Sequence, residues 1–167
     1  MDRTYRDFAA TGRYRVLSLF FMMCIKDIFQ HGRNYPFPRP LICQRDNCGS
    51  RRIWSHGFID AYFDGYGSAI CLKRYICADC GCVYTIRPFG YWPRHHAPLK
   101  IIVERLCHRI RNGVWGQSAY SRQRQGHWVR ALKKNIKIYL GLHFEGEVMD
   151  GFYGLLHAFR QPVIRSV

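Results

Sequence analysis

The sequence predicts an α+β protein in which a small antiparallel sheet is followed by a basic helical segment and preceded by an N-terminal helix. Three patterns support this fold class. An apolar run covers residues 16–29, short β-prone runs lie between residues 51 and 86, and apolar side chains recur at helical spacing after Pro98. With 167 residues, the chain is about one domain or two very small ones.

Two proline-rich stretches divide the chain. The turn signal at residues 31–34 ends the predicted N-terminal helix, and residues 35–40, with three prolines in five positions, favour an extended linker. Residues 88–98 form a second linker. We therefore predict four segments: an N-terminal helix and linker (1–40), a cysteine-bearing sheet and linker (41–97), a basic helix-turn-helix-like region (98–140) and a C-terminal tail (141–167).

The predicted sheet has three short strands. Residues 51–63 are aromatic and β-prone, and a glycine-rich turn follows at 64–68. Residues 69–76 then place Ile70, Leu72 and Ile76 on one side of a strand, and residues 83–86 give a third strand. This order predicts an antiparallel hairpin with one added strand.

Four cysteines flank this hairpin in two pairs. Cys43 and Cys48 are separated by four residues and Cys77 and Cys80 by two, and the second member of each pair precedes a glycine. A tight turn brings two thiolates together, and glycine lets the backbone bend beneath them. Four thiolates satisfy tetrahedral zinc and leave no open position. The sequence therefore predicts one structural, non-catalytic Zn²⁺ in a zinc ribbon.

Two alternatives to this ligand set stay open. Cys82 lies two residues beyond Cys80, so Cys82 could replace Cys80 as a ligand, although the tighter turn fits better. Disulfides or unrelated buried thiols would also use these cysteines. Residues 16–25 lack a small-residue cleavage site and are too short to cross a bilayer. We therefore expect a cytoplasmic, reducing compartment, where thiols more often bind metal than pair.

The chain is strongly basic. It has 26 Lys and Arg against 11 Asp and Glu, a net charge of +15. This balance predicts a polyanionic partner, nucleic acid more often than a membrane surface. Residues 98–140 carry ten of the basic side chains and a single acid, Glu104. We expect nucleic acid, and no membrane, to bind this segment.

The basic segment predicts two helices. Ser121 is a good N-cap for the second, which we extend to about Leu140. In a helix-turn-helix, the first turn of the second helix meets base edges in the major groove and later positions meet phosphates, although residues 114–120 are long for the turn of this motif. The predicted base contacts are Arg122, Gln123, Arg124 and Gln125, and the predicted phosphate contacts are Arg130, Lys133, Lys134 and Lys137.

The run from Lys73 to Gly81, KRYICADCG, resembles the zinc-ribbon signature at the start of insertion-sequence transposases. The upstream CGSRRI at residues 48–53 and His-Gly at 56–57 fit the same pattern. Across roughly residues 41–138 the chain is similar to small InsA-type proteins, and to uncharacterised mobile-element-associated domains with a proline-rich stretch, here residues 87–93. The resemblance implies a zinc ribbon with a helix-turn-helix that binds terminal DNA, and metal ligands at Cys43, Cys48, Cys77 and Cys80.

Catalysis is not expected. Transposases of the acidic-triad type need three separated carboxylates to hold two metal ions. After the cysteine pairs the chain offers Glu104, Glu145, Glu147 and Asp150, and the last three lie within six residues. The sequence therefore predicts a DNA-binding protein, not an enzyme.

Two other functions remain open. A zinc ribbon could bind RNA or single-stranded nucleic acid by stacking bases on Trp54, Tyr62, Phe63 and Tyr75. It could also be a protein-interaction module, or a remnant of a mobile element.

Overall fold

The computed structural model describes residues 16–157 and 162–163. The chain forms two compact units, residues 1–89 and 90–167, so the division falls within the second predicted linker. The predicted limits at residues 40 and 140 do not separate compact units. A strand from the first segment joins the sheet, and a helix from the predicted tail joins the helical core.

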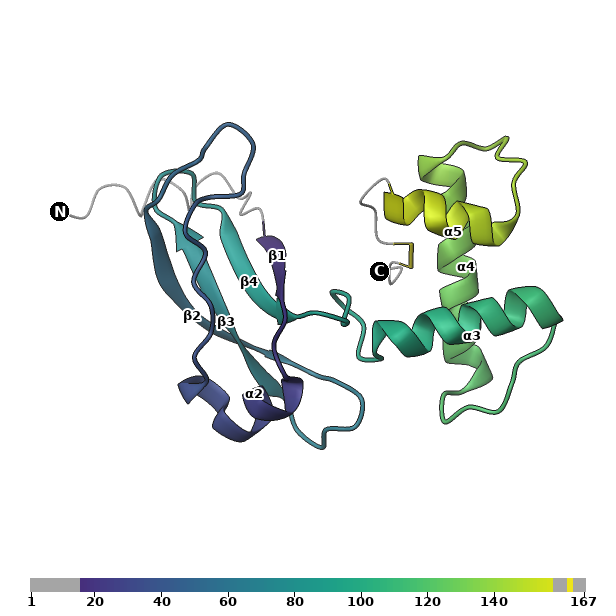
Figure 1. Ribbon diagram of the computed structural model, residues 1–167, viewed down its shortest axis with the longest axis horizontal. Coiled ribbons are helices and arrows are strands. Elements are labelled where there is room, and N and C mark those ends of the chain that lie inside the picture. The colour runs from purple at the N-terminus through teal and green to yellow at the C-terminus, as the bar shows by residue number, and fades with distance from the viewer. Residues whose placement is uncertain (1–15, 158–161, 164–167) are drawn as a thin grey trace. The chain divides into compact units, whose positions relative to one another are not determined.

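The first unit is a four-stranded sheet with the order β1-β4-β3-β2 (Figure 1). Strands β2 (Ile53–Ala61) and β3 (Ile70–Cys77) pair antiparallel, as do β3 and β4 (Val83–Pro88). These are the three predicted strands in the predicted order. A register shift between Ser55 and Phe58 interrupts the β2–β3 ladder.

The predicted N-terminal helix over residues 16–29 is wrong in its first half. Strand β1 (Val16–Phe21) pairs parallel with β4, and the helix α2 covers only Ile25–His31, followed by a 3-10 turn at Gly32–Asn34. In β1, Leu17, Leu19 and Phe21 pack against the sheet's buried cluster. Alternate residues on one side are the pattern of a strand with one buried face. A short run of mostly apolar residues does not reveal this period, because the run also fits a buried helix. Residues 1–15 of the predicted segment lie outside the described residues.

One face of the sheet carries a core that reaches the cysteines. Tyr75 and Tyr84 lie in this core, as do Ile53 and Ile86. Phe37, from the proline-rich stretch, packs against the cluster, and the Tyr75 hydroxyl donates to its carbonyl oxygen over 3.4 Å. The stretch predicted as a linker therefore covers part of the sheet.

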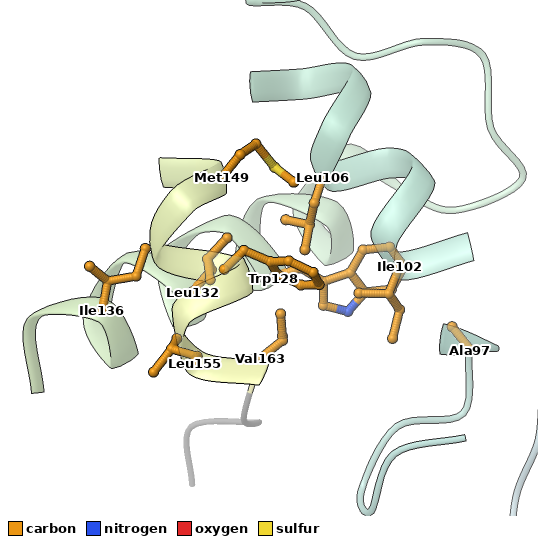
Figure 2. Close-up of a cluster of buried hydrophobic side chains, with 10 residues drawn as sticks. Ala97, Ile102, Leu106, Trp128, Leu132, Ile136, Met149, Leu155 and Val163 are labelled. Carbon is orange, nitrogen blue, oxygen red and sulfur yellow. The ribbon is translucent and has the colours of Figure 1, made fainter. Parts of the chain in front are cut away.

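The second unit contains α3 (Leu99–Asn112), α4 (Arg122–Tyr139) and α5 (Val148–His157). Their apolar faces meet around Trp128, which is 4% exposed (Figure 2). None of the helices in the described part of the chain is apolar over enough length to cross a bilayer. The buried cluster consists of Ala97, Ile102, Leu106, Trp128, Leu132, Ile136, Met149, Phe152, Leu155 and Val163.

Helix α5 lies in the segment that we predicted as a tail. Its glycines allow close packing on α4: a Cβ at Gly151 would lie 2.5 Å from Ile136 Cδ1 and 2.7 Å from Ile136 Cγ1. Ile136 is 5% exposed and belongs to the core, so it has little room to move. In sequence these glycines resemble helix breakers, but in the structure they allow α5 to approach α4.

We expect Gly151→Ala to lower the free energy of unfolding by about 1 kcal/mol, because overpacking outweighs the gain in helix propensity. Gly126→Ala is the matched control. Gly126 lies within α4, where an added Cβ would meet only the end of the Arg130 side chain at 3.4 Å. This control should gain about 0.5–1 kcal/mol. Urea denaturation of both variants tests the packing, and an equal gain in the two would contradict it.

Candidate metal centre and basic helix

Two loops at one end of the sheet hold the four cysteines. The Cys43 backbone N–H donates to the Ser50 carbonyl over 2.7 Å and closes the first loop. The Cys77 N–H donates to the Cys82 carbonyl over 2.9 Å and closes the second. Gly49 and Gly81 follow the second cysteine of each pair with φ of +58° and +68°. Both glycines therefore adopt a left-handed backbone, which gives the bend beneath the sulfurs that the sequence predicted.

Polar contacts join the two loops. The Asp79 carboxylate accepts from Ser50 Oγ and from Arg52 Nη1, the latter at 2.7 Å. The Ala78 backbone N–H donates to the Arg52 carbonyl over 2.9 Å, and Arg45 Nη1 donates to the Cys80 carbonyl over 3.1 Å. These contacts hold the two cysteine loops together and so fix the positions of the four sulfurs.

The sulfurs of Cys43, Cys48, Cys77 and Cys80 all lie within 4.8 Å of one another. Cys43 and Cys80 are 3.5 Å apart, and Cys48 and Cys77 are 3.8 Å apart. A disulfide needs about 2.05 Å. Tetrahedral bonds of about 2.3 Å from zinc to sulfur put neighbouring sulfurs about 3.8 Å apart. These spacings exclude disulfide pairing within the cluster and fit a single metal ion.

Tyr84 contacts this cluster from the sheet. Its hydroxyl is 2.8 Å from Cys43 Sγ and accepts the Gln44 backbone N–H over 3.0 Å. When Cys43 is a thiolate, as metal binding requires, the phenol donates its proton to the sulfur. The Tyr84 side chain is fully buried, so this hydrogen bond is shielded from water.

The surroundings shift the thiol pKa values apart. Burial acts against ionisation of Cys43, but hydrogen bonds from the Tyr84 hydroxyl and the Arg45 backbone outweigh it and lower its pKa to about 7. Burial is the main cause that raises the pKa of Cys80 to about 12. Four thiolates this close need a cation to ionise together, which is the charge balance that a metal ion supplies.

The structure selects Cys80 over Cys82. The Cys82 side chain is 1% exposed and belongs to the sheet core, and it is not a member of the four-sulfur cluster. Burial raises the pKa of its thiol. The ligand set expected from the sequence is therefore the one that the structure brings together.

Helix α4 presents an exposed basic face. Gln123, His127, Arg130, Lys134 and Lys137 recur at intervals of three or four residues and are all exposed, so they form one stripe along the helix. Arg122 and Lys133 are also exposed beside it. The ion pairs between described residues lie elsewhere, at the cysteine loops and between Lys100 and Glu104 on α3.

The predicted base-contacting residues separate into two groups. Ser121 caps α4, and its Oγ accepts the Arg124 backbone N–H over 3.2 Å, as predicted. Arg122 and Gln123 are exposed, whereas the Arg124 guanidinium lies 4.8 Å from the centre of the Tyr120 ring. Gln125 is 1% exposed and donates from Nε2 to the Tyr120 carbonyl over 2.8 Å. Gln125 is therefore not available on the helix surface, and its prediction as a groove contact is wrong.

The aromatic residues suggested for base stacking also differ in exposure. Trp54 is 48% exposed and Tyr62 is 61% exposed, but Phe63 and Tyr75 are buried at 2% and 7%. Arg52 lies 5.6 Å from the Trp54 ring centre. The sheet therefore offers exposed rings at two of the four positions.

Sequence analysis missed the side chains that support the centre. The Tyr84 hydroxyl and the Asp79 carboxylate are the most direct, and Asp79 lies within the Cys77–Cys80 turn. The signal available in the sequence was an acidic residue within one cysteine turn, Asp79, together with a basic residue beside the other turn, Arg52. Tyr84 gave none, because its contact depends on a pairing across 41 residues.

Comparison of the chain with protein-family models, with curated proteins and with solved structures found no match.

Metal content tests the ligand set. We expect about one zinc ion per purified chain. Cys77→Ser and Cys80→Ser should abolish metal binding, whereas Cys82→Ser should retain it, because the Cys82 sulfur lies outside the cluster. Elemental analysis of the three variants measures this. Loss of metal in Cys82→Ser with retention in Cys80→Ser would reverse the assignment.

Tyr84→Phe should weaken metal retention by about tenfold, because the Cys43 sulfur loses its donor. Competition with a chromogenic chelator measures the affinity. Tyr75→Phe is the matched control, since its hydroxyl lies in the same core but bonds to the Phe37 carbonyl. Equal affinities in the two variants would show that the contact with sulfur has no role in metal binding.

Proposed function

We propose that this protein binds duplex DNA through α4, on a scaffold stabilised by one structural zinc ion. The observation that carries the proposal is the exposed basic stripe of α4, which bears no acid along its length. A helix of this kind matches the charge of a phosphate backbone and is long enough to follow a groove.

The position of α4 supports binding in a fixed orientation. Its opposite face is buried through Trp128, Leu132 and Ile136, so the charged stripe is held on a packed element. Arg122 and Gln123 remain exposed in the first turn and are the proposed base contacts. Arg130, Lys133, Lys134 and Lys137 are the proposed phosphate contacts.

Zinc is the metal we propose for the cysteine cluster. Four sulfur ligands suit zinc, and they fill its coordination shell without a place for water or substrate. The metal would then stabilise the small sheet and take no part in a reaction. The likeness of KRYICADCG to the transposase zinc-ribbon signature supports a transposase-associated role within the cytoplasm.

Duplex binding as a function of salt tests the proposal. We expect affinity to fall steeply with salt, and the combined variant Arg130→Ala, Lys134→Ala should reduce the log–log slope by about 2, or about 1 for each lost phosphate contact. Lys100→Ala is the control, because this lysine lies on α3 beside Glu104. An unchanged slope in the combined variant would show that α4 does not meet the phosphates.

The exposed Trp54, with Arg52 beside its ring, favours single-stranded nucleic acid as the second candidate ligand. Preferential binding of single strands that is lost in Trp54→Ala would favour it over duplex binding by α4.

A further inference from the structure

We propose that a cavity between α3 and the start of α4 binds one unpaired nucleobase of a nucleic acid strand. The cavity has a volume of about 750 Å³ and lies entirely within the helical unit. Its lining includes Arg105, Trp115, Tyr120, Arg122 and Gln125. This inference rests on the proposed nucleic-acid function and adds a second contact to it.

The loop that forms one wall is tied to α3. Arg105 Nη1 donates to the Gln117 carbonyl over 2.6 Å, and the His108 ring nitrogen Nδ1 is 3.1 Å from the Val114 carbonyl. The Arg109 guanidinium lies 5.3 Å from the Trp115 ring centre. A Cβ at Gly116 would lie 3.2 Å from the His108 ring, so the loop rests directly on the helix. The loop that lines the cavity is therefore held against α3 by several contacts.

One residue that lines the cavity, Gln125, has an unused hydrogen-bond acceptor. Gln125 is 1% exposed, and its Nε2 donates to the Tyr120 carbonyl, which fixes the orientation of the amide. Its Oε1 is then buried without a partner in the described part of the chain. A buried polar atom of this kind is normally satisfied. A ligand that donates an N–H group to the cavity would satisfy it.

A matching unused donor lies on another lining residue. Arg105 Nε is buried and also lacks a partner among the described residues, although Nη1 of the same guanidinium is bonded to the loop. Two residues that line the cavity therefore carry one acceptor and one donor without partners in the ranges that the structure describes, and the aromatic side chains of Trp115 and Tyr120 line it as well. Nucleobases combine a flat aromatic ring with donors and acceptors along one edge, which proteins recognise by stacking and edge hydrogen bonds.

The charge around the cavity indicates how the base would remain attached to a strand. Arg122 is exposed and lines the cavity at the first turn of α4, next to the basic stripe. A phosphate near Arg122 would place its own base at the opening. A paired base already uses its Watson–Crick donors and acceptors and is stacked between its neighbours, so the ligand is a base outside the duplex stack.

Two binding measurements on the full-length protein test the cavity. In the first, the four 5′-mononucleotides and ribose 5-phosphate are titrated into ¹⁵N-labelled protein. We expect mononucleotides to shift the Trp115 indole and the Gln125 side-chain amide, and ribose 5-phosphate to shift neither. Trp115→Ala and Gln125→Met should weaken mononucleotide binding by about tenfold or more. Tyr153→Ala removes an exposed ring on α5 that does not line the cavity, and it should leave mononucleotide binding unchanged. Thermal melts test whether each variant is folded. If Gln125→Met is unfolded, Trp115→Ala alone decides the result.

The second measurement compares a paired duplex with the same duplex carrying one unpaired adenosine. The unpaired base should add affinity in the wild type and add none in Trp115→Ala. Equal shifts by ribose 5-phosphate, or mononucleotide binding that Trp115→Ala does not change, would overturn the cavity and leave duplex binding by α4 intact. Mononucleotide binding without any duplex binding would overturn the proposed function but not the cavity. If mononucleotides bind but the unpaired adenosine adds no affinity, the ligand is a free nucleotide, and the assignment to a strand is wrong.

Discussion

The convergence of four sulfurs at one end of the sheet is the constraint on which the first unit depends. Residues 35–52 contain no helix or strand, yet this stretch supplies Cys43, Cys48 and the Phe37 side chain to the core. It is held there by its contacts with the β3–β4 turn and with the sheet core. Because four thiolates repel one another at these distances, a cation is needed to make their convergence stabilising.

The core and the metal centre are therefore one structure. Tyr84 lies in β4, where its ring packs among apolar side chains while its hydroxyl reaches the Cys43 sulfur. A shift of β4 would change the contact between the Tyr84 hydroxyl and the Cys43 sulfur. Loss of the sulfur cluster would remove that contact from a buried hydroxyl. This coupling explains how a sheet of short strands can support a long irregular segment.

Features that depend on residues near one another in sequence could be predicted. The cysteine pairs, the backbone bends at Gly49 and Gly81 and the Ser121 cap each require only a few neighbouring positions, and all are present in the structure. Features that depend on distant pairing could not. Strand β1 pairs with residues 67 positions later, from Val16 to Val83, and its apolar sequence also fits a helix. Gly151 is explained only by Ile136 on another helix.

Gln125 shows how the same limitation affects function. Its position in the first turn of α4 favours a groove contact when only helix periodicity is considered, but the loop before the helix folds back so that Tyr120 receives its amide proton. Of the four predicted base contacts, only Arg122 and Gln123 are exposed on the surface of this turn, since Arg124 lies on the Tyr120 ring. In the proposed complex, phosphate contacts by the rest of α4 would supply affinity for any sequence. Discrimination between bases would then require directional groups in a site shielded from water, and the buried Gln125 oxygen and Arg105 nitrogen are the groups that we propose for it.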